Sequence, residues 1–461
     1  MSLSAARRAG VDAFLATADQ ALRSEGAKAP LFLRRLREEG VASFGRLGFP
    51  APDDEEWRYT SVAPVARGVF TPSPAVVPAR ERVEERGRAL ALDGRLGPVA
   101  FSDRKKTQLV FVNGRFSAEW SSTERLPAGA ALEPLSAALE KRLHLLDRHL
   151  GRMAKSAGHP FIALNTSHLR DGALLHVAKG IALADPVFVY WVTTGTSQPP
   201  LMVSPRTLVV LEEGAQAFLV ESFVGTGAVT FVNAVTEAAL APGAVLDHAK
   251  LQCEGPETLH IGNLRLAQEG DSQSRSHLFS FGGKLVRNEL EVLLGGDGAG
   301  TALNGLYCVS GAQHVDNHTL IDHARPHGSS QEFYKGILDG SARGAFDGRI
   351  VVRPSARKTD ARQTNRNLIL SDTALVDSKP QLEIYNNDVK CTHGSTTGRL
   401  DESMVFYLRS RGLDEEAARS LLTFAFGSEM VEKVTTNDLY AFLEATLLSW
   451  LSRSGAPPEV P

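Results

Sequence analysis

Residues 207–252 read TLVVLEEGAQAFLVESFVGTGAVTFVNAVTEAALAPGAVLDHAKLQ and decide the fold of the chain. The stretch consists of short runs rich in valine, leucine and phenylalanine, interrupted by glycine turns. The three- and four-residue spacing of apolar residues that marks a helix is missing from it. Runs of this length between turn residues indicate β-strands, and the same pattern extends from residue 171 to residue 400.

The glycine turns recur at a regular interval. Gly214, Gly243, Gly270 and Gly298 follow one another at about 28 residues, a period typical of stacked supersecondary units. Because the repeated unit contains strands and turns without helical connections, each coil would bury its inner face only against its neighbours. The sequence therefore predicts a mainly β fold with a parallel β-helix over residues 171–400. A β-sandwich with regularly spaced turns is the alternative.

Both flanks of this core have helical patterns. Residues 1–170 are predicted to form a mostly helical N-terminal domain with one β-hairpin, which turns at the Asn-Gly pair of residues 113–114. Residues 401–461 are predicted to form a C-terminal helical domain. Asp401 and Asp414 are suitable N-caps for its first two helices.

The composition of the 461 residues excludes several classes of protein. With 43% hydrophobic and 22% charged residues and a net charge of -3, the chain is neither disordered nor suited to bind nucleic acid or anionic lipid. We find no apolar run of about eighteen residues and no signal-peptide pattern, so we expect no membrane contact and a cytoplasmic location. Three distant cysteines, Cys253, Cys308 and Cys391, fit a reducing compartment.

Common enzyme motifs are missing from the sequence. It contains no G-x-x-x-x-G-K-[ST] loop, no G-x-S-x-G elbow, no H-E-x-x-H helix and no C-x-x-C pair. It also lacks the glycine fingerprint of a dinucleotide site. We therefore do not expect the chain to be an ATPase or another enzyme.

A histidine-rich segment, residues 312–336, invites a metal hypothesis. It holds His314, His318, His323 and His327 with several carboxylates. In extended strands, side chains alternate between faces, so the first two histidines would lie on one side and the last two on the other. One site that uses all four is not expected, and hydrogen-bonded polar residues on a solenoid face or at a subunit contact are the simpler interpretation.

A second candidate site is the pair Cys391 and His393 in IYNNDVKCTHGSTTG. Two residues apart on a strand, a thiolate and an imidazole point to the same face and can both ligate iron, zinc or copper. Two ligands do not complete a site, so other residues or a second chain would have to supply the rest. A fortuitous pair and a Cys-His nucleophile stay open.

Long stretches of the chain resemble one family. They are residues 379–426 (KPQLEIYNNDVKCTHGSTTGRLDESMVFYLRSRGLDEEAARSLLTFAF), 313–338 (QHVDNHTLIDHARPHGSSQEFYKGIL), 280–307 (SFGGKLVRNELEVLLGGDGAGTALNGLY) and 55–62 (EEWRYTSV). They are similar to the SufB/SufD family of iron–sulfur cluster assembly scaffolds. The SufB branch is expected to carry a glutamate before the histidine, whereas this sequence reads VKCTHGST, which resembles the SufD branch.

The resemblance implies a right-handed β-helix between two helical domains, and a non-catalytic scaffold subunit of the Suf complex. It implies pairing with SufB through the β-helices and binding of the SufC ATPase through residues 401–461. It also implies that His393 faces SufB across the subunit contact, so we expect His393, with Cys391 second, to contact a nascent iron–sulfur cluster or iron that is held transiently and shared with SufB. A reduced flavin in the complex and a homodimer in isolation are left open.

Phe406, Tyr407 and Phe424 are candidate anchors for SufC, because their short helices carry more apolar residues than they can bury alone. Two other functions share the predicted architecture. One is a β-helix polysaccharide lyase, which would normally be secreted, and the other is a structural adaptor without a metal role.

Overall fold

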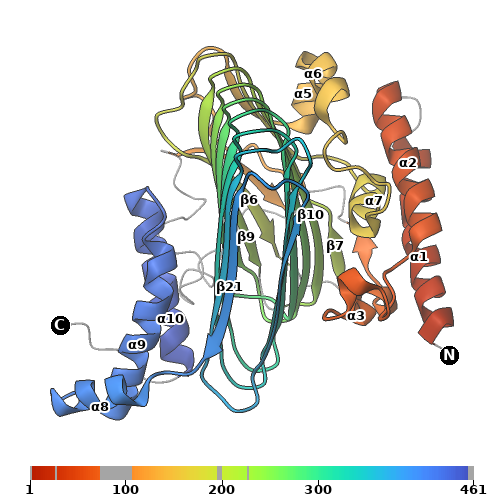
Figure 1. The fold of residues 1–461 in the computed structure, drawn as a ribbon. Coiled ribbons are helices and arrows are strands. Elements are labelled where there is room, and N and C mark those ends of the chain that lie inside the picture. Colours follow the sequence, from red (N-terminus) through yellow and green to blue (C-terminus); the bar gives the residue numbers. More distant parts are fainter. Residues whose placement is uncertain (1–2, 26–28, 73–105, 195–199, 226–227, 455–461) are drawn as a thin grey trace.

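The predicted parallel β-helix is confirmed by a computed structural model of the chain (Figure 1). The structure describes residues 3–25, 29–72, 106–194, 200–225 and 228–454. Successive strands of the core alternate between an 11-stranded and a 10-stranded sheet, and each pairs in parallel with a strand one coil away. The chain therefore winds as a two-sheet solenoid.

The strands of the two sheets have the following bounds. The 11-stranded sheet contains β1 (Thr71–Pro72), β4 (Ala130–Pro134), β5 (Ala173–Val177), β7 (Leu201–Val203), β8 (Arg206–Leu211), β10 (Thr230–Leu240), β12 (Thr258–Gln268), β14 (Leu285–Leu294), β16 (His314–His323), β18 (Arg343–Val352) and β20 (Leu375–Ile384). The 10-stranded sheet contains β2 (Thr107–Val112), β3 (Arg115–Phe116), β6 (Val187–Thr193), β9 (Gln216–Gly225), β11 (Val245–Cys253), β13 (Gln273–Ser280), β15 (Gly300–Val309), β17 (Ser329–Leu338), β19 (Asp360–Ile369) and β21 (Lys390–Gly398).

Alternating side chains point into the solenoid and away from it. The inward residues form one long apolar cluster that includes Leu219, Leu246, Leu303 and Ala361. The outward residues of both sheets are also buried over most strands, because helices cover them. This double burial explains why the strands read as nearly continuous apolar runs.

The glycine period marks one corner of the solenoid. Gly214 and Gly243 have φ angles of 68° and 69°, which glycine adopts without the steric cost of a Cβ. Each donates its backbone N–H to a carbonyl of the next coil, at 2.9 Å in both cases. In the coil where the sequence suggested Gly270, the left-handed residue is Asp271, with φ 56°, so the repeat is offset there by one residue.

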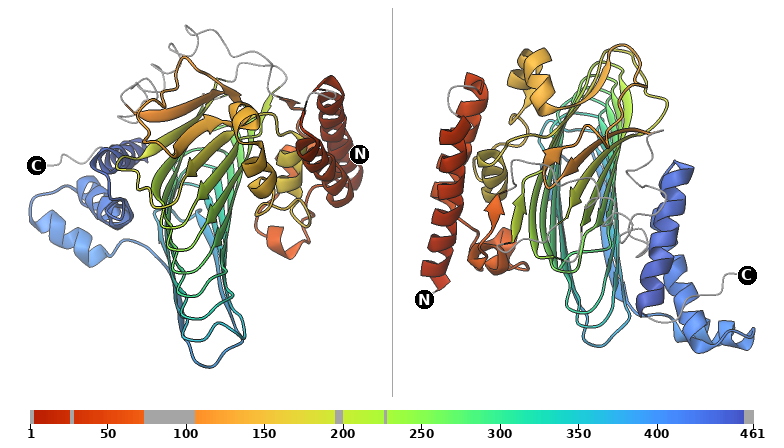
Figure 2. Two further views of the ribbon diagram at one scale, coloured as in Figure 1. Left: turned by 90° about the horizontal axis from the view of Figure 1, so that it is seen from above. Right: turned by 180° about the vertical axis from the view of Figure 1, so that it is seen from behind.

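The N-terminal helices cover the outer face of the 11-stranded sheet (Figure 2). They are α1 (Leu3–Glu25), α2 (Leu31–Leu47), the short 3-10 helix η2 (Glu55–Trp57), α3 (Ala63–Arg67), α5 (Leu135–Lys141), α6 (Leu143–His149) and α7 (Pro160–Ser167). Phe14 and Phe161 of these helices pack on Phe231 of β10, with ring centroids 6.2 and 6.3 Å away.

The predicted hairpin at residues 113–114 is confirmed. β2 and β3 pair antiparallel, and Asn113 and Gly114 both have positive φ angles, 51° and 75°. β2 also pairs with β6, and β4 pairs with β5. Strands before residue 171 therefore already pair with strands of the solenoid, so the sheets extend beyond the predicted start of the core.

Of the three C-terminal helices, the last two cover the outer face of the 10-stranded sheet, and the first extends away from it (Figure 1). They are α8 (Glu402–Ser410), α9 (Glu415–Val431) and α10 (Asn437–Ser454). Both predicted caps are confirmed, since Asp401 accepts the N–H of Ser403 and Asp414 that of Ala417, each at 2.8 Å. The last seven residues of the predicted C-terminal domain, 455–461, lie outside the described part of the chain.

β20 and β21 form the last coil, and each is the terminal strand of its sheet. Their outer edges have no strand partner in the described chain. No helix among the described residues is long and apolar enough to cross a membrane.

Candidate functional site

The solenoid places Cys391 and His393 on its last strand, β21. In the register with β19, Cys391 lies beside Ala361 and His393 beside Gln363. Cys391 packs on the inner apolar cluster, so both residues lie on the inward face of the strand. Cys391 is half-buried and His393 is exposed. The thiol and the imidazole are thus presented at the open end of the solenoid.

These two side chains do not complete a metal site by themselves. Among the described residues, no group of three or more His, Cys, Asp or Glu side chains is arranged to hold a metal ion. Partial burial raises the pKa of the Cys391 thiol, so a positive group or a metal would be needed to favour the thiolate. The geometry fits a site that is finished by another chain at this end.

The structure separates the four clustered histidines. His314 and His318 lie on the outer face of β16, where they contact Thr60 at 2.8 Å and Asp316 at 3.0 Å. His323 points inward and pairs with the Ser330 hydroxyl at 2.8 Å. His327 is exposed in the corner turn with φ 62°. Because β16 ends at His323, strand alternation does not extend to His327, and the expected pairing of these two residues on one face does not occur.

The outer-face histidines belong to a buried network that fixes the N-terminal segment to the sheet. Arg287 of β14 lies 3.7 Å from the ring centroid of Trp57 and donates to Asp316 at 2.6 Å. Thr60 also donates to Asp316. His318 and Arg287 lower the pKa of the Asp316 carboxyl far below its usual range, against the effect of burial. The network is structural. Trp57 and Thr60 are too far in sequence from Arg287 and Asp316 for their contact to be predicted.

Two inward polar residues lie in line with His393, and the sequence analysis placed neither of them there. Gln363 donates through Nε2 to Glu332 Oε2 at 2.6 Å, and both side chains are buried. Burial raises the pKa of Glu332 to about 7. Glu332, Gln363 and His393 follow one another at about one coil length, which is the signal that could have identified them.

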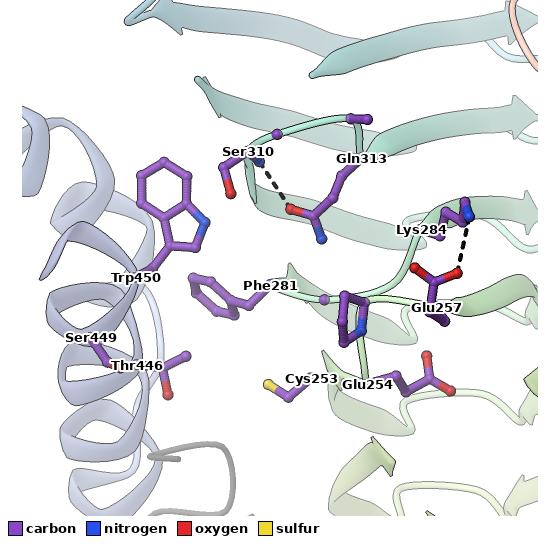
Figure 3. Close-up of a pocket in the computed structure, with 14 residues that line it drawn as sticks. Cys253, Glu254, Glu257, Phe281, Lys284, Ser310, Gln313, Thr446, Ser449 and Trp450 are labelled. Carbon is purple, nitrogen blue, oxygen red and sulfur yellow. Dashed lines mark hydrogen bonds and ion pairs between the residues drawn. The ribbon is translucent and has the colours of Figure 1, made fainter. Parts of the chain in front are cut away.

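The other two cysteines lie on the outer face of the 10-stranded sheet. Both are buried, and burial raises the pKa of the Cys308 thiol strongly. Cys253 lines a pocket of about 460 Å³ between α10 and three turns of the solenoid, together with Phe281 and Trp450 (Figure 3). An ion pair of Glu257 and Lys284, at 3.0 Å, also lines this pocket. No histidine is among the lining residues.

The three predicted anchors for a helical-domain partner differ in exposure. Phe406 and Tyr407 on α8 are 73% and 50% exposed. Phe424 on α9 is half-buried and packs on the apolar cluster that attaches α9 and α10 to the sheet. Phe406 and Tyr407 therefore offer a free surface, whereas Phe424 is largely used in docking its own helix.

Comparison with known proteins agrees with this architecture. Residues 192–426 match the model of the SUF system FeS cluster assembly SufBD core domain, and residues 102–189 match the SufBD protein N-terminal region. An iron–sulfur cluster assembly SufBD family protein of Synechocystis is 31% identical over 415 residues, which cover 86% of this chain and 87% of that protein. The iron–sulfur cluster assembly protein SufD of Escherichia coli is 30% identical over 396 residues, with 86% and 87% covered. The chain therefore belongs to the SufBD family of iron–sulfur cluster assembly proteins.

Proposed function

We propose that this chain is a SufD-like, non-catalytic scaffold subunit of a cytoplasmic Suf complex. It pairs with SufB, binds SufC, and contributes His393, with Cys391 second, to the place where a nascent cluster or iron is held as cargo. The observation that carries the proposal is the position of Cys391 and His393 on the inward face of a terminal strand, where a second chain can supply the missing ligands.

The open end of the solenoid supports pairing with a second β-helix. The edges of β20 and β21 present backbone N–H and C=O groups without a strand partner in the described chain, and such edges bind additional strands. Exposed apolar residues lie along and beside β20: Leu375, Ile384 and Tyr385. A second parallel β-helix, which we expect SufB to have, would match this surface in strand direction and spacing.

The exposed rings on α8 support the assignment of SufC to the C-terminal helices. Met404, Phe406 and Tyr407 are all exposed on this short helix, while Val405 is buried. A cluster of exposed apolar side chains on a monomer marks a protein interaction site.

The test is to co-express the chain with SufB and SufC, purify the complex without oxygen, and measure iron and acid-labile sulfide. His393→Ala should leave the complex assembled, because the exposed imidazole contributes little to the core, but it should lower iron and sulfide at least several-fold. His144→Ala, on the exposed surface of α6, is the matched control. Wild-type iron and sulfide in the His393→Ala complex would contradict the ligand role and favour a structural adaptor.

A further inference from the structure

Glu332, Gln363 and His393 form a column on the inner face of the 10-stranded sheet, which we call the inner column. Parallel pairing places Gln363 directly beside Glu332 and His393 directly beside Gln363. Neighbouring strands lie about 4.8 Å apart, so the Gln363 amide is the polar group that lies between the buried carboxyl and the exposed imidazole.

The Gln363 amide is fixed on one side and free on the other. Its Nε2 donates to Glu332 Oε2 at 2.6 Å, whereas its Oε1 is buried and has no hydrogen-bond partner among the described residues. Gln363 is only 2% exposed. Gly348 on the opposite sheet makes room for it, since a Cβ there would lie 2.3 Å from Gln363 Nε2. A buried acceptor without a donor is costly, so an N–H from the neighbouring imidazole of His393 would stabilise this oxygen.

A neighbouring pair of residues on the same two strands, Asn365 of β19 and Ser395 of β21, is linked by hydrogen bonds. Ser378 of β20 donates to Asn365 Oδ1 at 2.9 Å and contacts the Ser395 hydroxyl of β21 at 2.8 Å. Through this pair, the terminal strand is joined to the strand before it. In the inner column, the corresponding link between Gln363 and His393 is missing, and both the acceptor and the imidazole that could fill it are present.

We propose that Gln363, held by Glu332, is a positioning residue that accepts a hydrogen bond from the imidazole of His393. A neutral imidazole carries one N–H and one lone pair, so an acceptor at one nitrogen leaves the lone pair on the other nitrogen for a metal. Gln363 thereby selects the tautomer in which His393 can ligate. This inference rests on the proposed function only in taking His393 as a ligand, because the hydrogen bond itself does not require a cluster.

The test uses the full chain with ¹⁵N-labelled histidine and long-range ¹H–¹⁵N correlation spectra, in which His393→Ala identifies the signals of His393. We expect one tautomer to dominate in the wild type. Gln363→Met, which removes the acceptor, should change the tautomer ratio about fivefold, the factor that one net hydrogen bond supplies. Gln331→Met on the exposed outer face of β17 is the matched control and should change nothing.

Two further variants keep the test decisive. Gln363→Glu should restore the wild-type ratio, because a carboxyl that stays protonated beside Glu332 offers the same donor and acceptor as the amide. Gln363→Asn stays polar but moves the oxygen away from His393, so it should change the tautomer ratio as Gln363→Met does. It takes the place of Gln363→Met in the test if that variant does not fold. An unchanged ratio in Gln363→Met or Gln363→Asn would overturn the proposal. Oε1 would then be satisfied by water or by the buried Tyr334 hydroxyl, which also has no hydrogen-bond partner within the described ranges.

Iron and sulfide in the co-purified complex separate the two proposals. If both stand, Gln363→Met lowers the cluster yield and Gln363→Glu restores it. A normal yield in His393→Ala, with the tautomer still changed by Gln363→Met, would refute the ligand role and leave the positioning contact intact. A reduced yield in His393→Ala, with no tautomer change in Gln363→Met, would refute the positioning contact alone.

Discussion

At the scale of single residues, the buried environment of Glu332 affects the pH dependence of folding. It lies inside the solenoid with a hydrogen bond from Gln363, and burial still raises its pKa from 4.5 to about 7. An isolated carboxylate is costly to bury. The folded state therefore binds the proton of Glu332 more tightly than the unfolded chain does.

The pH dependence of stability should show this effect. The contribution of this proton to the stability of the folded state is fully present below pH 4.5, and it is lost as the pH rises from 4.5 through 7. Glu332→Gln does not titrate, so its free energy of unfolding relative to wild type should rise from pH 5 to pH 8 by at most about 3 kcal/mol. Urea unfolding at several pH values measures the difference.

The control for this comparison is Glu269→Gln, which changes an exposed carboxylate in a corner turn. Its difference from wild type should stay flat over the same range. If Glu332→Gln were equally flat, the carboxyl of Glu332 would have to titrate alike in the folded and unfolded states.

At the scale of secondary-structure elements, α8 combines one buried residue with a ring-bearing exposed surface. Val405 is buried, while Phe406 and Tyr407 are exposed. An exposed side chain contributes little to folding, within about 0.5 kcal/mol, so these rings can be removed without unfolding the helix. This division allows binding and stability to be tested separately.

We predict that Phe406→Ala together with Tyr407→Ala leaves the melting temperature of the chain nearly unchanged and weakens capture of SufC at least tenfold. The loss of two aromatic anchors accounts for the size of the effect. Val405→Ala is the reverse case, with a lower melting temperature and SufC binding retained in the folded fraction. Full SufC capture by the double variant would place the SufC surface elsewhere.

A core substitution in the same domain tests how α10 is attached. Leu447 is fully buried in the cluster between α9, α10 and the 10-stranded sheet. Leu447→Ala should lower the free energy of unfolding by about 2–5 kcal/mol, the usual cost of such a cavity. Thermal unfolding followed by circular dichroism measures it, and Leu421→Ala on the exposed side of α9 is the control.

Local elements could be predicted from the sequence, and their docking could not. The caps Asp401 and Asp414 and the turn at residues 113–114 are signals within a few residues, and the structure contains all three. The half-burial of Phe424 depends on which face of α9 meets the sheet. That choice depends on residues about a hundred positions away, which the local pattern of the helix does not specify.

At the scale of the whole molecule, the solenoid could be predicted because its repeat is regular, but its inner column could not. The corner turns recur at a nearly constant interval, although Asp271, His327 and Lys358 take the place of glycine in three of them. The neighbours of His393 depend on exact register, and an offset of one residue would move them to the opposite face. The position of Gln363 beside His393 therefore needed the paired strands themselves.

The exposed edge of the last coil predicts self-association when SufB is absent. Tyr385 directly follows β20 and is 61% exposed. Tyr385→Lys adds a charge that discourages edge pairing, so it should lower the dimer fraction in sedimentation experiments and also weaken SufB binding. Leu293→Lys, an exposed apolar position on the outer face of β14, should leave both unchanged. Equal behaviour of the two variants would place the contact away from the open end.

The parallel winding of the chain also sets an order in time. Each coil rests on the coil before it, and at about 5–20 residues per second a ribosome releases a coil of about 30 residues every few seconds. The early coils can therefore fold while the later ones are still being translated. The end that carries His393 becomes available only when most of the chain has been made, so a partner that binds there meets a subunit that is already built.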